Sequence, residues 1–299
     1  MDYKHISTFL DYCKTHKRLS LHTIRAYKND LLQFYNSNYT SVETYVEHLT
    51  KSNIKSSTLR RKIASLKVFY SYLKYHNLID ENPFNQLRFQ FRTEKILPKT
   101  IPYDILKSIF SHLELKVTYS KTKYQKQKAE RNLLIISLLL STGIRISELC
   151  HIHLKNINLS NQTLHIMGKG KKERILFLGD QTTFNLLETY MNKTGNESND
   201  FLFPGKHSLK PLSEQSVRLI LKRIVEQNSL SRTITPHMFR HSFATMLLDS
   251  DVDIRCIQQI LGHSSISVTQ IYTHVSQSKQ KEILTLCNPI TLIHSQSKK

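Results

Sequence analysis

The chain has 299 residues, 39% hydrophobic and 22% charged, which is enough for one large domain or two ordinary ones. Lys and Arg number 43 against 23 Asp and Glu, and the net charge of +20 favours a polyanionic partner, with nucleic acid ahead of a membrane surface. The apolar runs are far shorter than the roughly 20 residues of a membrane span, and the N-terminus lacks an apolar signal core. These features exclude an integral membrane protein and predict a cytoplasmic one.

Residues 1–87 are predicted to form a helical N-terminal domain. Apolar residues recur in it at helical spacing, most clearly over 56–77. The Asn-Pro pair at 82–83 ends this block, because a residue before proline is biased away from the helical region. The stretch 88–100 has no helical period and carries a further proline, so we expect it to be an interdomain linker.

A line of cations runs along the predicted helix at 56–77. Arg60, Lys67 and Lys74 lie seven residues apart, away from the apolar stripe, and Arg61 stands beside them. A solvated helix face would carry the same charges, but the regular spacing favours contacts with phosphate groups. Arg60, Arg61, Lys67 and Lys74 are therefore predicted to bind DNA.

Residues 101–299 are predicted to form a second domain, mainly α with a small antiparallel β-sheet. Over 157–178 the apolar residues alternate as they do in strands, and the segment 168–172 is predicted to be a lysine-rich hairpin tip. Thr235-Pro236 predicts a helix start, because it places a capping residue before a proline.

Further helices are expected around this sheet. The helical predictions cover 102–114, 131–141, 212–228 and 252–261. Ser267 and Gln270 form a capping-box pattern that predicts one more short helix. The polar segment 118–128 is expected to be a solvent loop or an exposed helical extension. On the helix at 212–228 three cations point away from the apolar face and are predicted DNA contacts: Arg218, Lys222 and Arg223.

Six polar residues of the second domain stand at unusual places in this layout: Arg145, Lys169, His237, Arg240, His263 and Tyr272. Each has an ordinary structural explanation alone, but together they could cleave a phosphodiester without a metal. Two arginines can bind both non-bridging oxygens of one phosphate. A tyrosine can attack phosphorus, a lysine can protonate the leaving 5′ oxygen, and a histidine can accept the tyrosine proton or donate to the phosphate.

The motifs TGIRISEL, GKGKKER, HMFRH, LGHSS and IYTH, in this order, resemble those of the tyrosine recombinases, the family of phage integrases and Xer recombinases. SLHTIRAYKNDL and LRRKIASLKVFYSYL resemble that family's all-α, SAM-like core-binding domain. The resemblance implies that Tyr272 is the nucleophile, Arg145 and Arg240 bind the phosphate, and Lys169 is the general acid. His237 would accept the tyrosine proton or donate to the phosphate, and His263 would hydrogen-bond the phosphate. Lys171 and Lys172 stay open as alternative acids, and Glu148 is taken as structural support.

The same resemblance implies how the protein works. Two domains are expected to close as a clamp on duplex DNA, and a homotetramer to hold two synapsed sites and exchange strands through a Holliday junction. A second recombinase or an accessory protein is a further partner that the sequence leaves open. The tail at 279–293 carries apolar residues and is expected to dock on a neighbouring subunit.

Other classes of protein fit parts of this pattern. A topoisomerase or telomere resolvase would share the cleavage step, and a non-catalytic DNA-binding regulator would share the fold. A metal-dependent nuclease is disfavoured, because no acidic cluster of the two-metal type accompanies the arginines. The four cysteines form no CxxC pair, which argues against a zinc finger and against a disulfide framework. No metal and no cofactor are expected. The segment 115–130 is longer and more basic than in Xer-type proteins, which leaves its role open.

Overall fold

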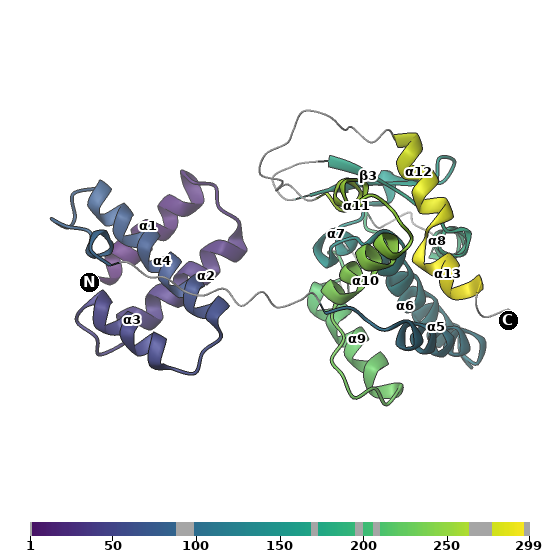
Figure 1. Cartoon of the computed structure of the whole chain (residues 1–299), viewed down its shortest axis with the longest axis horizontal. Helices are drawn as coiled ribbons and strands as arrows, with labels where there is room; N and C mark the ends of the chain where they lie inside the picture. The colour runs from purple at the N-terminus through teal and green to yellow at the C-terminus, as the bar shows by residue number, and fades with distance from the viewer. Residues whose placement is uncertain are drawn as a thin grey trace. The chain divides into compact units, whose positions relative to one another are not determined.

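The computed structural model divides into two compact units, Met1–Ile96 and Leu97–Lys299, and is mainly helical with one small antiparallel sheet, which confirms the predicted fold class (Figure 1). The structure describes residues 2–87, 99–168, 173–194, 200–205, 210–262 and 277–295. Most of the predicted linker at 88–100 lies outside these ranges. Among the helices that the structure describes, none is both long and apolar enough to cross a membrane.

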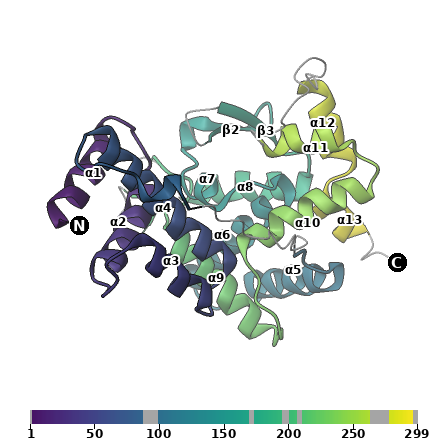
Figure 2. The ribbon, with the colours of Figure 1, turned by 60° about the vertical axis from the view of Figure 1, so that its left-hand side comes forward.

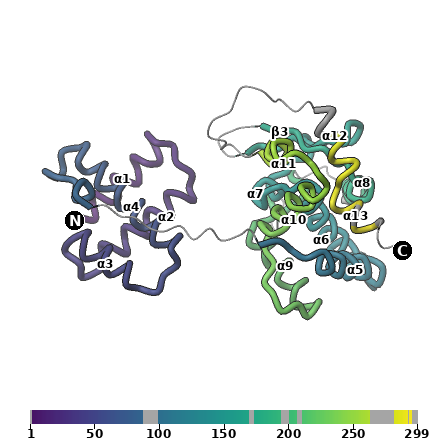
Figure 3. The backbone as a smooth tube through the Cα atoms, in the orientation of Figure 1, coloured from purple at the N-terminus to yellow at the C-terminus, as the bar shows by residue number. Residues whose placement is uncertain are grey.

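The N-terminal unit is built from four helices and one 3-10 turn: α1 (Tyr3–Thr15), α2 (Leu21–Tyr35), α3 (Val42–Lys51), α4 (Ser56–Tyr75) and η1 (Pro83–Asn85). Figure 3 follows their backbone. The apolar stripe predicted on α4 is buried at Leu59, Ile63 and Leu66, which pack with Phe9 and Leu31 of the first two helices. Burial of this stripe accounts for the helical pattern read from the sequence.

The second unit surrounds a long buried helix. Its helical elements are α5 (Tyr103–Thr118), α6 (Lys123–Thr142), α7 (Ile146–Cys150), η2 (Leu154–Asn156), α8 (Gln181–Thr194), α9 (Glu214–Gln227), α10 (Pro236–Asp249), α11 (Ile254–Leu261), α12 (Gln277–Leu286) and α13 (Pro289–Ser295). Helices α5, α8, α10 and α13 all contact α6, whose C-terminal half is buried. In Figure 2, α10 crosses the unit above α5. The central helix thus ends in the interior, next to the residues of the candidate site.

The polar segment at 118–128 is mostly helical. Helix α5 continues to Thr118, and α6 already begins at Lys123. A capping box at Thr122 and Gln125 fixes this start, because each side chain bonds the other residue's backbone amide. Of the two forms that the sequence allowed here, the exposed helical extension is therefore the one that forms.

Three short strands form the sheet in the order β1 (Ile157–Asn158), β2 (Thr163–Met167) and β3 (Glu173–Phe177), all antiparallel. Leu164 pairs with Leu176, and both are buried together with Ile166. The strand register is thus set by one apolar face, as the alternation in the sequence predicted.

The C-terminal helices pack on their own unit. Ile283 and Leu284 of α12 and Ile290 and Ile293 of α13 are buried, and in Figure 1 both helices lie along the side of the unit. The fully buried Asn288 between them donates from Nδ2 to the Ser141 carbonyl oxygen at 3.2 Å. These four apolar side chains are covered in cis, whereas Leu286 of α12 is exposed. The docking of this tail on a neighbouring subunit stays a prediction.

Substitution of Gly179 is expected to loosen α12 and α13. A Cβ at Gly179 would lie 2.1 Å from the carbonyl oxygen of Leu284, so the helix backbone rests directly on this glycine. Gly179→Ala should weaken the docking by about 1–3 kcal/mol, the usual cost of overpacking. Amide hydrogen exchange in α12 and α13 measures the effect, with the exposed Thr285→Ala as a matched control. Unchanged exchange in Gly179→Ala would contradict this packing.

Candidate active site

Arg145 is placed by a tight turn at the end of α6. Gly143 ends this helix with φ of 60°, and a Cβ there would lie 2.5 Å from Cδ1 of Phe243, so only glycine fits. Arg145 then caps α7 and stays partly exposed. Its Nη2 donates to the carbonyl oxygen of Gly262 at 3.3 Å, although the two residues lie far apart in the sequence.

Arg240 lies on α10 and reaches the same turn from within the core. Its Nη1 donates to the Gly143 carbonyl oxygen and its Nη2 to the Leu261 carbonyl oxygen, both at 2.7 Å. Burial, and then the positive charges of Arg145 and Arg174, lower the pKa of Arg240 to about 10, so it stays charged at neutral pH. A guanidinium carries five N–H groups, which leaves donors for a phosphate beside these two carbonyl bonds.

A single buried carboxylate links two arginines at this site. Glu148 accepts from the backbone N of Arg145 at 3.0 Å and from its Nη1 at 2.9 Å. Glu148 also accepts from Nη1 and Nη2 of Arg174 on β3, at 2.9 and 2.7 Å. Burial by itself would raise the pKa of Glu148, but the hydrogen bonds and charge of Arg174 and the bonds from Arg145 outweigh it, and the pKa is lowered.

Sequence reasoning gave Glu148 a supporting role and missed Arg174. The strand pattern held a signal for it, since residue 174 shares a strand face with the buried Leu176. A charged residue on the buried face of a strand needs a partner of opposite charge. That partner is Glu148, and the two residues form a bidentate pair.

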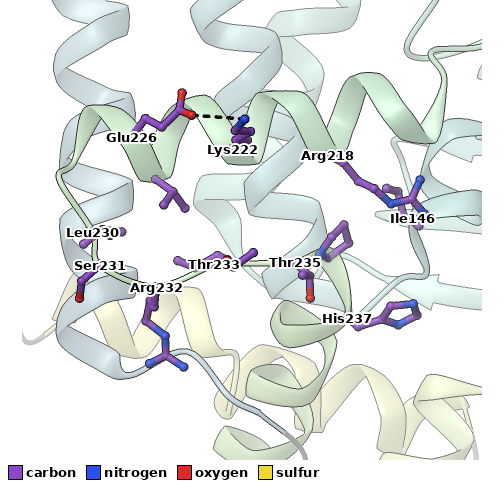
Figure 4. A pocket seen from close by; sticks show the side chains of 13 residues that line it. Ile146, Arg218, Lys222, Glu226, Leu230, Ser231, Arg232, Thr233, Thr235 and His237 are labelled. Carbon is purple, nitrogen blue, oxygen red and sulfur yellow. Dashed lines mark ion pairs between the residues drawn. The ribbon is translucent and has the colours of Figure 1, made fainter. Parts of the chain in front are cut away.

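His237 is exposed at the first turn of α10 and borders a cavity of about 610 Å³. In Figure 4 the cavity lies between α9, which carries Arg218 and Lys222, and the segment from Leu230 to Pro236. Among the described residues, two cations on α9 form exposed ion pairs within the helix: Arg218 with Glu214 at 2.7 Å and Lys222 with Glu226 at 3.7 Å. Such exposed ion pairs contribute little to stability, so these cations can form phosphate contacts instead.

The N-terminal cations predicted to bind DNA lie on the exposed side of α4, in the first of the two units. Arg60 and Lys67 are exposed, and Lys74 donates from Nζ to the Asp80 carbonyl oxygen at 2.6 Å. Arg61 forms an ion pair with the buried Asp30. Arg61 therefore stabilises the fold, which the spacing of the cations in the sequence did not reveal.

Several residues named from the sequence lie outside the described residues: Lys169, Lys171, Lys172, His263 and Tyr272. The described chain nevertheless reaches the positions beside them. Strands β2 and β3 bracket 169–172. Helix α11 ends at Leu261, and its C-cap Gly262 directly precedes His263. Arg145 and Arg240 both bind carbonyl oxygens at this end of α11. The structure thus brings together Arg145, Arg240 and the turn that leads into the last two motifs.

Comparisons with known proteins identify the family. Residues 108–279 match the model of the phage integrase family, and residues 6–77 match that of the phage integrase N-terminal SAM-like domain. A tyrosine recombinase of Agathobacter rectalis is 48% identical over 95% of this chain and 96% of its own length. A tyrosine recombinase XerC of Pediococcus pentosaceus is 32% identical over 93% of this chain and 95% of its own.

Solved structures resemble the fold. XerH recombinase bound to its difH substrate has a TM-score of 0.65 at 23% identity, covering 94% of this chain and 84% of that one. The integrase of transposon Tn1549 with circular intermediate DNA has a TM-score of 0.64 at 17% identity, covering 93% and 97%. The chain belongs to the phage integrase family. It is a tyrosine recombinase, which confirms the resemblance drawn from its motifs.

Proposed function

We propose that this recombinase cleaves and rejoins duplex DNA through a covalent 3′-phosphotyrosine at Tyr272. The convergence of Arg145 and Arg240 on the turn at Gly262 is the observation that supports it best, because two guanidinium groups can then bind one phosphate close to the chain that leads to Tyr272. The tyrosine oxygen attacks phosphorus, the bond to the 5′ oxygen breaks, and that oxygen takes a proton. The reverse attack by a 5′ hydroxyl rejoins the strand.

The other predicted residues have supporting roles in this proposal. Lys169 protonates the leaving 5′ oxygen, with Lys171 and Lys172 as alternatives. His237 accepts the tyrosine proton or donates to the phosphate, and His263 hydrogen-bonds the phosphate. Arg218, Lys222 and Arg223 of α9, with the cations of α4, bind the DNA backbone. Salt should therefore weaken DNA binding strongly, since each phosphate contact releases counterions.

The assembly and setting belong to the same proposal. A homotetramer in the cytoplasm holds two double-stranded sites and exchanges their strands through a Holliday junction, with or without a second recombinase or an accessory protein. The double-stranded DNA partner is the part of this proposal that the relatives support, since XerH and the Tn1549 integrase were both solved with DNA. Size measurements on the protein–DNA complex test the tetramer.

Tyr272→Phe is expected to abolish covalent attachment to DNA, because only the phenolic oxygen can form the ester. The measurement uses a nicked suicide duplex that carries a candidate site, followed by denaturing electrophoresis. Wild type should form an adduct that survives denaturation, while the variant binds the duplex with unchanged affinity and forms none. Tyr119→Phe is a matched control, since Tyr119 is exposed on the hairpin between α5 and α6.

The same assay separates the alternatives. An adduct that persists in Tyr272→Phe would show that another residue is the nucleophile. Cleavage should continue in EDTA, whereas a metal-dependent nuclease would stop. Relaxed circles without recombinant junctions would indicate a topoisomerase, and hairpin ends a telomere resolvase. Tight binding of the cognate site with no adduct would indicate a regulator that has lost the chemistry.

A further inference from the structure

Arg174 stands at the junction of three parts of the site. It is on β3, directly beyond the lysine-bearing segment 169–172, and its side chain is 14% exposed. Both of its Nη nitrogens bind Glu148, which in turn holds the backbone and side chain of Arg145. A single carboxylate therefore connects Arg174 on β3 with the first phosphate-binding arginine.

The same side chain also supports the turn at Gly262. A Cβ on Gly262 would lie 3.0 Å from Cδ and 3.2 Å from Nη1 of Arg174, so arginine and turn are in close contact. Nε of Arg174 is buried and has no hydrogen-bond partner among the described residues. Burial of a donor without a hydrogen-bond partner is unfavourable. Native proteins usually retain such a donor only where the side chain has another role that holds it in place.

The positive charge of Arg174 gives this side chain such a role. If Glu148 were paired with Arg145 alone, the carboxylate would cancel most of the positive charge that this arginine offers to a phosphate. With Arg174 as a second partner, the cluster of Arg145, Arg174, Arg240 and Glu148 keeps a net charge of +2 at neutral pH. A phosphodiester carries one negative charge and its pentacoordinate transition state carries two, so the extra positive charge favours the transition state most.

We propose that Arg174 is a positioning residue for strand cleavage. It shares the charge of Glu148, so that Arg145 stays available to the phosphate. Arg174 does not itself touch the DNA in this proposal. It acts through Glu148 and through the turn at Gly262. The inference rests on the proposed phosphotyrosine chemistry and adds a residue to it.

The test compares Arg174→Gln with wild type on two suicide duplexes, one with an ordinary scissile phosphate and one with a neutral methylphosphonate. On the phosphate, the adduct should form about 10- to 100-fold more slowly, as for other residues that orient a ligand-binding group, with DNA affinity changed by less than about threefold. On the methylphosphonate the gap between variant and wild type should shrink, because less negative charge develops. Lys193→Gln removes one exposed cation on α8 and is the control for net charge.

A second variant tests the proposal independently if Arg174→Gln folds poorly. The double variant Arg174→Gln with Glu148→Gln removes both charges of the pair and restores a net charge of +2, so it should cleave faster than Arg174→Gln alone. An equal defect on both duplexes, or a double variant slower than the single one, would overturn the role in electrostatics. Wild-type rates in Arg174→Gln would overturn the inference altogether. Absence of an adduct from wild type itself would instead overturn the proposed function.

Discussion

Replacing Arg240 with alanine is expected to reduce the rate of covalent adduct formation by about 10²–10³-fold, the loss that follows removal of one preorganised donor to a transition-state oxyanion. Arg240 is 6% exposed and charged, and it approaches the proposed phosphate site from the core. The loss should appear in the rate at saturating protein rather than in DNA affinity, because the charge on the phosphate rises only in the transition state.

Arg240→Ala should also destabilise the fold. The carbonyl oxygens of Gly143 and Leu261 would lose the donors that bind them at 2.7 Å, at a cost of about 1–3 kcal/mol for each group left buried and unsatisfied. Arg240→Lys is the sharper variant, since one ammonium group keeps the charge but cannot bind two carbonyl oxygens and a phosphate in fork geometry. Single-turnover cleavage and urea unfolding separate the two effects. Full activity in Arg240→Lys would contradict the bidentate role.

Replacing Glu148 with alanine is expected to lower the free energy of unfolding by about 3–5 kcal/mol, because the partners of a buried carboxylate lose their counter-charge. Arg174 and Arg145 would then repel each other and the nearby Arg240. Glu226→Ala is the matched control. This variant breaks the pair of Glu226 with Lys222, whose side chains are 57% and 71% exposed, and should cost about 1 kcal/mol or less.

The stabilisation from Glu148 should depend on pH with a defined sign. Its pKa is lower in the folded protein than in the unfolded chain, where glutamate titrates near pH ~4.3. The stabilisation is therefore complete above that value and is lost as the pH falls through the folded pKa. Chemical unfolding of wild type and Glu148→Gln at a series of pH values measures it. The difference between them should be constant near neutral pH and shrink in acid, and a difference that grew in acid would contradict the assignment.

The elements of the fold were accessible from local patterns because each depends on a short stretch of chain. The stripe on α4, the alternation in β2 and β3 and the Thr235-Pro236 start of α10 all appear where they were predicted. The polar hairpin between α5 and α6 was harder, because a polar segment that helical capping stabilises has the same composition as a loop. The candidate arginines were found through motif order, which reflects the chemistry of phosphate binding.

Contacts that join distant parts of the chain could not be predicted in this way. The bond from Arg240 to Gly143 spans 97 residues and the pair of Arg174 with Glu148 spans 26, and no periodicity records either one. The sequence also showed that the tail is apolar without showing which surface covers it. In the structure, the absence of a side chain at Gly179 lets the backbone of α12 pack against this glycine, so the tail is covered by its own unit.

By itself, then, the sequence determined the mainly helical class, the basic surface and the residue types that bind a phosphate, because composition, period and motif spacing are local properties. Only the tertiary structure decided that Arg145 and Arg240 meet at the end of α11, that Arg174 shares Glu148 with Arg145, and that Arg61 is held by Asp30. These pairings depend on how buried helices and strands pack, and packing brings together side chains whose separation along the chain carries no local signal.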